Sequence, residues 1–167
     1  MSEDVNSICQ GWWTREISAD TGSARKTRAE LRRADTALKA LGVPAVHRLN
    51  AALAAGGFKV RHDPARLALI AVALANIKES GPKVARAFGA GEPPSLSPIR
   101  FNALIRAATP EMLWRPLSRA LAVVRGKAAP GALAADLFYW SEQTRTRWCF
   151  EYYGETAATP IELETET

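Results

Sequence analysis

Cysteine and histidine, from which disulfide scaffolds and metal sites are most often built, are scarce in this sequence. Its 167 residues include two cysteines and two histidines. Cys9 and Cys149 show neither a pairing pattern nor the spacing of metal ligands, so we expect two free, reduced thiols. His47 and His62 have no cysteine, histidine or carboxylate at ligand spacing. The sequence therefore predicts neither a metal ion nor a cofactor.

Long apolar runs are absent as well. The longest run, residues 67–75, is far shorter than the roughly 20 residues that a membrane-spanning helix requires. The N-terminus is acidic and shows no signal-peptide pattern. We therefore expect a cytoplasmic protein that does not associate with membranes.

The residue patterns of the common catalytic sites are also missing. No Ser-His-Asp or Cys-His arrangement can be assembled, and no glycine-rich loop has the pattern that binds nucleotide phosphates. Glu111 and Asp63 are explained as helix starts, and Asp136 either favours the N-terminal end of a helix or pairs with an arginine. The sequence therefore predicts a protein that is not an enzyme and has no catalytic residues.

Positive charge, in contrast, is abundant over most of the chain. The full sequence has 22 Lys and Arg against 17 Asp and Glu, a net charge of +5. Residues 155–167 contain four Glu and no basic residue, so residues 1–154 carry 22 basic against 13 acidic residues, a net charge of +9. A basic body with an acidic end is typical of proteins that bind nucleic acid, although a solvated basic surface has the same composition.

The apolar residues recur at intervals of three and four, and no stretch alternates as a β-strand does. This pattern predicts an all-α fold. The stripe of the second helix extends through Leu38 and Leu41, and Pro116 is expected to kink or interrupt its helix near Met112. The expected helices are residues 3–17, 23–41, 44–55, 64–79, 83–88, 98–108, 111–125 and 131–153.

Glycine, proline and serine are concentrated in residues 89–98, GAGEPPSLSP, which is the best candidate for a linker. The sequence therefore predicts two small helical bundles joined by a short Gly/Pro/Ser linker. We place the N-terminal bundle in residues 1–90 and the C-terminal bundle in residues 97–154. An acidic flexible tail, residues 155–167, is expected to follow.

The last predicted helix is apolar on two faces. One stripe, which includes Trp140 and Trp148, has the spacing of a core face. A second stripe, nearly opposite, consists of Tyr139, Phe150 and Tyr153. Such a helix either runs through the middle of a bundle or contacts another molecule. For the second stripe we favour burial in the C-terminal bundle over a subunit interface.

Basic side chains gather on helix faces that turn away from the predicted core. Five lie within the first eleven positions of the second helix, against one Glu, and the C-terminal bundle contributes six further candidates. Such side chains bind phosphates without reading sequence, or they are solvated or paired within the chain. The candidates for nucleic-acid contact are Arg25, Lys26, Arg28, Arg32, Arg33, Arg100, Arg106, Arg115, Arg119, Arg145 and Arg147.

Four groups of residues, spread over about residues 10–153, occur in an order found in a known family. They are Trp12-Trp13, GSARKTRAELRR over residues 22–33, Arg100-Phe101-x-x-Leu104-Ile105, and Asp136-Leu137-Phe138-x-Trp140 with Trp148-x-x-x-Tyr152-Tyr153. Each motif alone is common. In their order and spacing, the chain resembles the CasB family, the small subunit of the type I-E CRISPR Cascade complex.

The resemblance implies a non-catalytic small subunit of this RNA-guided surveillance complex, which serves antiviral defence. It implies a basic surface that stabilises the crRNA–target DNA duplex and the displaced strand of the R-loop, while a separate helicase-nuclease cuts. The implied partners are crRNA, target DNA, other Cascade subunits and a second copy of the chain. Arg28, Arg32, Arg33 and Arg100 fall on matching motif positions. A helical protein–protein adaptor with no direct nucleic-acid role is the alternative.

Overall fold

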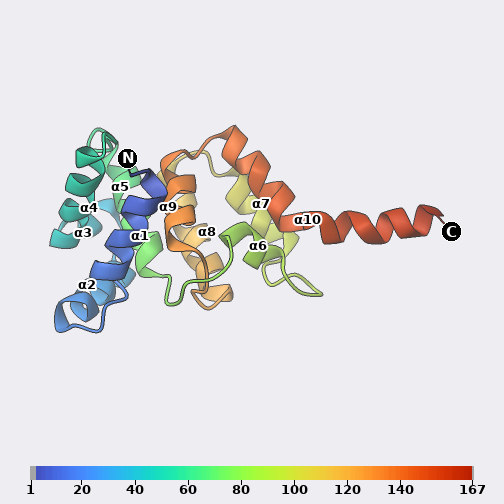
Figure 1. Cartoon of the computed structure of the whole chain (residues 1–167), viewed down its shortest axis with the longest axis horizontal. Helices are drawn as coiled ribbons and strands as arrows, with labels where there is room; N and C mark the ends of the chain where they lie inside the picture. The colour runs from blue at the N-terminus through green and yellow to red at the C-terminus, as the bar shows by residue number, and fades with distance from the viewer. Residues whose placement is uncertain (1–2, 167) are drawn as a thin grey trace.

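The computed structural model describes the backbone of residues 3–166 and the side chains of residues 3–154 (Figure 1). Within these residues the fold is all-α, as predicted, and the β-type pairing is limited to an isolated bridge between Glu79 and Lys127. The acidic flexible tail predicted for residues 155–167 lies outside the residues whose side chains are described. The helices are α1 (Val5–Glu16), α2 (Gly22–Arg33), α3 (Ala37–Leu41), α4 (Pro44–Ala55), α5 (Pro64–Ala75), α6 (Val84–Gly89), α7 (Pro98–Arg106), α8 (Pro110–Val123), α9 (Pro130–Phe138) and α10 (Glu142–Glu166).

Most helices begin where the sequence provides a side-chain cap or a proline. Proline occupies the first turn of α4, α5, α7, α8 and α9, where its missing N–H would have had no helical partner. The caps satisfy amides that the first turn leaves free. Each cap accepts a hydrogen bond from the amide three residues later, and they are Asp4, Thr21, Thr36, Asp63, Ser97 and Thr109.

Helix α5 is the centre of the core. Its residues 67–75 are all buried, because α5 packs against α2, α3, α4, α8 and α9. A helix that is apolar on every side needs neighbours on every side. Two buried tryptophans of α1 add polar anchors: Trp12 Nε1 donates to the carbonyl of Ala45 at 2.8 Å, and Trp13 Nε1 donates to that of Ile77 at 3.1 Å. These bonds fix α1 against the start of α4 and the segment just after α5.

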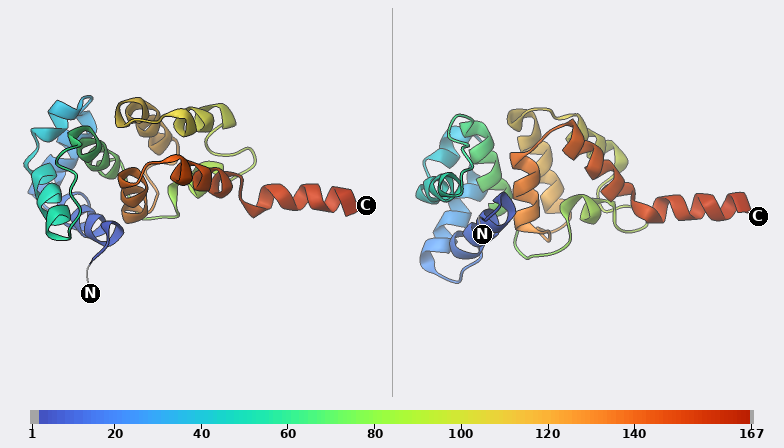
Figure 2. Two further views of the ribbon diagram at one scale, coloured as in Figure 1. Left: turned by 90° about the horizontal axis from the view of Figure 1, so that it is seen from above. Right: turned by 45° about the horizontal axis from the view of Figure 1, so that its top comes forward.

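Helix α9 lies against the N-terminal helices, packing on both α1 and α5 (Figures 1 and 2). The approach is close, because a Cβ added at Gly131 would lie 2.1 Å from Asn6 Oδ1. Helix α6, which precedes the expected linker, packs against α10. The buried apolar side chains form one continuous cluster across both halves. The division into two bundles at residues 90–97 stays a prediction.

The second predicted helix, residues 23–41, is wrong as a single element. Ala34 is extended, with ψ 113°, and Thr36 caps the separate helix α3. The predicted apolar stripe therefore fails at Leu38, which is 81% exposed. A capping threonine inside a periodic pattern is a stop-and-restart signal that periodicity alone does not detect.

The last predicted helix, residues 131–153, is also wrong as a single element, because the chain turns between α9 and α10. Tyr139 ends α9 with ψ 34°, and its carbonyl accepts a 2.8 Å hydrogen bond from Thr144 Oγ1. Ser141 Oγ accepts a 3.2 Å hydrogen bond from the Thr144 amide, as an N-terminal cap does. The turn reorients α10 relative to α9.

The favoured burial of the second aromatic stripe is wrong as well. Tyr139, Phe150 and Tyr153 are 53%, 76% and 50% exposed. Over residues 142–154, where burial is described, the buried face of α10 is the one that carries Trp148 and Tyr152.

The interruption expected from Pro116 does not occur. Helix α8 runs from Pro110 to Val123 with Pro116 inside it. Proline removes one hydrogen bond to the carbonyl of Met112, four residues earlier. Burial of Leu113 and Leu117 on either side of it stabilises the helix against this loss.

Candidate nucleic-acid interface

Arg28 and Arg32 lie one turn apart on α2 and are both held by main-chain carbonyls. Arg28 Nη1 donates to the carbonyls of Ile17 at 2.9 Å and Ala19 at 3.3 Å, and Arg32 Nε donates to that of Ala75 at 2.7 Å. Carbonyl oxygens orient the guanidinium groups without cancelling their charge. The pair is therefore fixed in place and remains cationic.

These two arginines line a pocket of about 320 Å³ together with Lys78. Partial burial lowers the pKa of the Arg32 guanidinium, and the like charge of Arg28 lowers it further to a smaller extent. Asp20 is the one acid on the pocket wall, and it is 96% exposed and pairs with Arg25 at 2.8 Å. An anion entering this pocket would offset the repulsion between the cations.

Three further cations come from loops that the sequence analysis did not connect: Lys78 after α5, and Arg125 and Lys127 after α8. The Gly126 carbonyl accepts the amide of Lys78 at 2.8 Å, so the two loops lie side by side. All three side chains are exposed. The signal that could have found them is a cation just past a helix C-terminus, where the helix dipole favours positive charge.

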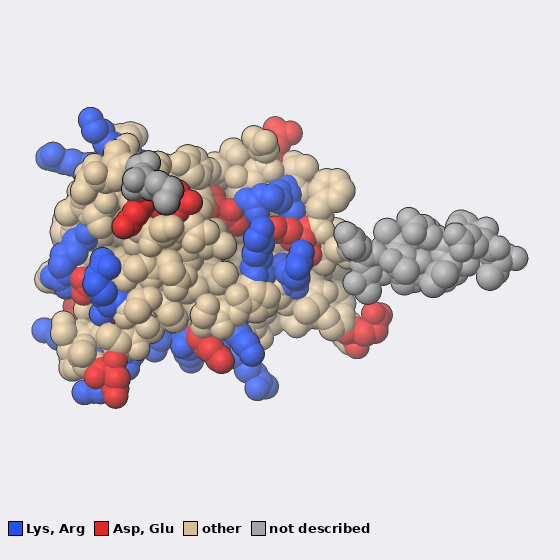
Figure 3. Space-filling view, in the orientation of Figure 1, with Lys and Arg blue, Asp and Glu red and all other residues tan. Residues whose placement is uncertain are grey.

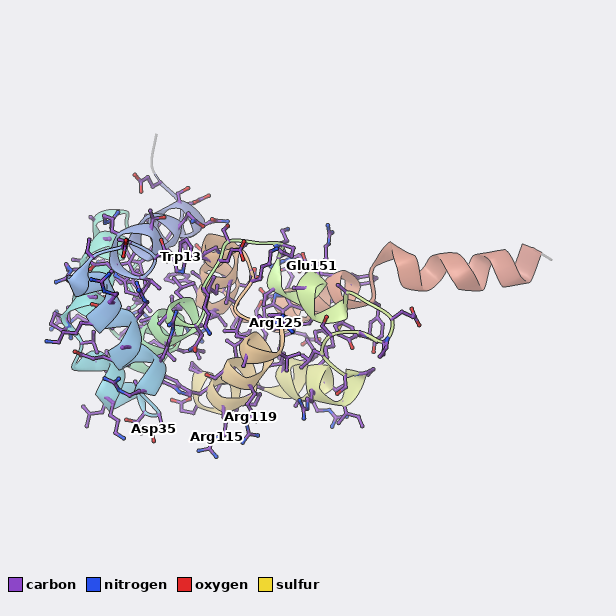
Figure 4. The ribbon with its side chains drawn as sticks, turned by 90° about the horizontal axis from the view of Figure 1, so that it is seen from below. Trp13, Asp35, Arg115, Arg119, Arg125 and Glu151 are labelled. Carbon is purple, nitrogen blue, oxygen red and sulfur yellow. The ribbon has the colours of Figure 1, made fainter. Side chains whose placement is uncertain are left out.

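Arginines of α7 and α8 form the next part of the surface. Arg100 and Arg119 line a common pocket of about 320 Å³. Arg115 and Arg119 project from the same side of α8, and Arg125 lies at its C-terminal end (Figure 4). Lys39 chiefly, and Arg115 to a smaller extent, lower the pKa of Asp35, which places Arg115 near the turn between α2 and α3.

Several of these arginines have no acidic partner. In the part of the chain with described side chains, Arg33, Arg100, Arg106, Arg115 and Arg119 are exposed and make no side-chain hydrogen bond or ion pair. We use the name α2–α8 basic surface for Arg28, Arg32, Arg33, Lys78, Arg100, Arg115, Arg119, Arg125 and Lys127. Arg106 lies at the end of α7 and stays a separate candidate.

Arg145 and Arg147 have structural partners instead. Arg145 Nη1 donates to the carbonyl of Ile105 at 3.0 Å. Arg147 pairs with Asp136 and, at 3.3 Å, with Glu151, and the hydrogen bond to Asp136 is the main cause of its raised pKa. Asp136, which the sequence left between two roles, therefore pairs with an arginine.

The two remaining candidates are paired on the surface of α2. Arg25 pairs with Asp20, and Lys26 lies 3.9 Å from Glu30. Exposed pairs of this kind contribute little to stability and exchange readily with other anions. The structure thus brings part of the predicted set together, whereas Arg145 and Arg147 are bonded to groups within the chain.

One face of the molecule shows how the charges are spread (Figure 3). Lys and Arg side chains gather over the N-terminal helices, along the lower edge, and over α6 and α10, where acidic side chains lie between them. A broad uncharged area separates the first group from the last.

The described residues form neither a metal site nor a membrane span. Among them, no cluster of three or more His, Cys, Asp and Glu is arranged to hold a metal ion. None of the helices they form has the length and apolar character needed to span a membrane. The fold and the surface thus define a class: a small all-α protein that presents cations without internal acidic partners.

Comparison with known proteins identifies the family. The model of the CRISPR-associated protein Cse2 family matches residues 27–153, about three quarters of the chain. The chain belongs to this family, which confirms the resemblance to CasB, another name for the Cse2 subunit. A search of curated protein sequences found no match.

A solved structure supports the fold. The chain is similar to one in the crystal structure of E. coli Cascade bound to a PAM-containing dsDNA target with a 32-nt spacer. The TM-score is 0.58 at 20% identity, and the match covers 89% of this chain and 95% of that one.

Proposed function

We propose that the chain is the non-catalytic small subunit of a type I-E CRISPR Cascade complex and holds nucleic-acid backbones on the α2–α8 basic surface. Membership of the Cse2 family supports the subunit role, as does the shared fold with a chain of E. coli Cascade on a DNA target. Its partners in this role are crRNA, target DNA, the other subunits and a second copy of the chain. The chain itself supplies no catalytic group.

The observation that carries the nucleic-acid role is the group of Arg28, Arg32 and Lys78 around one pocket. Carbonyls fix both guanidinium groups, and the terminal nitrogens of Arg32 have no partner among the described residues. A guanidinium presents its N–H groups as a planar fork that matches two phosphate oxygens. The group therefore suits a backbone phosphate, which would also offset the repulsion between the cations.

Backbone contacts are the kind of interaction that R-loop formation needs. Exchanging a DNA duplex for an RNA–DNA duplex is nearly balanced in free energy, so contacts that do not read sequence can decide the outcome. Cations on a rigid helical surface supply such contacts. The guide RNA remains the part that reads sequence.

The test is charge reversal at Arg33, Arg115 and Arg119 in a reconstituted complex. These three are preferred to Arg28 and Arg32, because the latter brace carbonyls and their loss would weaken the fold. We expect complex assembly to be normal and the apparent affinity for R-loop formation to fall at least about tenfold, the size of one lost charge-assisted hydrogen bond.

A matched control changes charge equally on another face. Arg15, Lys59 and Arg61 are exposed, make no ion pair among the described residues, and belong to α1 and the α4–α5 loop. Reversing them should leave R-loop formation near the wild-type level. Equal losses in both triple variants would mean that net charge alone matters. No loss in either would favour the protein–protein adaptor.

A further inference from the structure

A cleft between α10 and the loop after α6 has no part in the α2–α8 basic surface. Its volume is about 1090 Å³. Arg86 and residues 89–91 form one wall, and Arg147 with residues 150–154 forms the other. Two exposed aromatic rings, Phe150 and Tyr153, line this cleft.

The wall that carries these rings is rigid. The backbones of α6 and α10 touch, since a Cβ added at Gly89 would lie 1.8 Å from the carbonyl oxygen of Tyr152. The Tyr152 hydroxyl donates to the carbonyl of Leu96 at 2.6 Å, and its ring stacks on Phe101 with centroids 4.0 Å apart. Tyr153 packs edge-on against Tyr152 at 4.9 Å. The ring of Tyr153 is therefore positioned before any ligand arrives.

Phe150 stands apart from this stack. It is 76% exposed, and its ring pairs with no other aromatic ring among the described residues. Among the residues with described side chains, those around the cleft are aromatic or charged, or are alanine and glycine, and none is Leu, Ile, Val or Met. Flat rings without aliphatic neighbours suit a planar ligand better than an aliphatic anchor from a protein partner.

The described residues that line the cleft carry a net positive charge. Glu151, labelled in Figure 4, pairs with Lys83 at 3.5 Å and with Arg147 at 3.3 Å. Arg147 also pairs with Asp136, so both acids are neutralised. Arg86 is exposed and has no ion pair in the described part of the chain. Its charge is available to a ligand.

We propose that this cleft binds single-stranded nucleic acid, with bases stacked on Phe150 and Tyr153 and a backbone phosphate on Arg86. Aromatic rings that alternate with cations are how proteins hold single strands without reading sequence. The inference rests on the proposed function, because the basic body of the protein brings the strand to the cleft. The cleft differs from the α2–α8 basic surface in its chemistry. Base stacking depends little on salt concentration, whereas phosphate contacts depend on it steeply.

The test measures binding of a fluorescein-labelled single-stranded oligothymidylate to the full chain by anisotropy, over a range of salt concentrations. The double variant Phe150→Ala, Tyr153→Ala should bind at least about fivefold more weakly, which is the value of one lost base stack. Its salt dependence should stay that of the wild type. The variant Phe150→Trp with Tyr153→Phe keeps both rings and should bind as the wild type does. Tyr139→Ala removes an exposed ring outside the cleft and should have no effect.

The outcomes separate this inference from the proposed function. If the alanine pair binds like the wild type while reversal of Arg33, Arg115 and Arg119 abolishes binding, the stacking cleft is overturned and the basic surface stands. If the alanine pair binds normally but fails to enter the assembled complex, the cleft is a protein-docking site. Failure of the wild-type chain to bind the oligonucleotide would overturn both proposals. Circular dichroism checks that each variant is folded.

Discussion

The salt dependence of DNA binding gives the sharpest quantitative prediction for the α2–α8 basic surface. The perturbation is the triple change of Arg33, Arg115 and Arg119 to Gln, which removes three charges and keeps three uncharged polar side chains. All three are exposed and have no internal acidic partner among the described residues, so the change should leave the fold intact. Each belongs to a helix surface that the core fixes.

The magnitude follows from counterion release. Each phosphate contact contributes about 0.9 to the slope of log K against log salt for duplex DNA and about 0.7 for a single strand. Three contacts should therefore lower the magnitude of the slope by about 2 to 3. Each exposed cation without a partner should contribute its full value to the slope. Arg145 and Arg147 should contribute little, because they are bonded within the chain.

The assay is titration of labelled duplex and single-stranded DNA at several salt concentrations, with the wild type, the triple Gln variant and a control changed at Arg15, Lys59 and Arg61. The control has the same net charge. Its slope should stay close to that of the wild type. Equal slopes for all three proteins would refute the reasoning, because the arginines would then release no counterions.

Three further predictions concern packing, thiol chemistry and the acidic segment. Gly131→Ala should lower the free energy of unfolding by about 1–3 kcal/mol, because the added Cβ would overlap Asn6. Gly22→Ala is the control and should be neutral, because its Cβ would have nothing within 4 Å. Equal free energies of unfolding for the two variants in chemical denaturation would contradict this. Burial raises the pKa of the Cys9 thiol to about 12, so iodoacetamide at neutral pH should modify half-buried Cys149 first, as mass spectrometry would show. Since this folded-state pKa lies above the ordinary 9.0, the linked stability is present below about pH 9 and is lost as pH rises toward 12. Deleting residues 155–167 raises the net charge from +5 to +9 and should tighten binding to DNA at low salt; a weaker or unchanged affinity would contradict it.

The sequence predicted the helical class and much of the core because those depend on local pattern. The apolar stripe of α5 is visible in the periodicity of residues 64–79, and the Gly and Pro residues before it mark its start. The helix ends at Ala75, with Asn76 as its C-cap, four residues before the predicted end. Periodicity does not predict the breaks at Ala34 and Tyr139, because the caps Thr36 and Ser141 start new helices inside an apolar pattern that continues across each break.

The basic surface could be predicted only in part. The positive charge of α2 and α8 can be counted directly from their sequences, whereas the hydrogen-bond partners of each arginine lie in distant segments. Arg28 and Arg32 reach carbonyls 9 to 43 residues away, and Arg145 reaches one 40 residues away. The sequence does not predict Lys78 and Lys127 as part of this surface, because their loops come together only in the folded chain.

Site-specific photocrosslinking in the assembled complex tests the central claim most directly. A benzophenone amino acid replaces Arg119 on the α2–α8 basic surface or, as the control, Arg61 in the α4–α5 loop. After target DNA is added, the account predicts nucleic-acid crosslinks from position 119 and few or none from position 61. Crosslinks from position 119 to protein subunits alone would contradict it and would identify the chain as an adaptor.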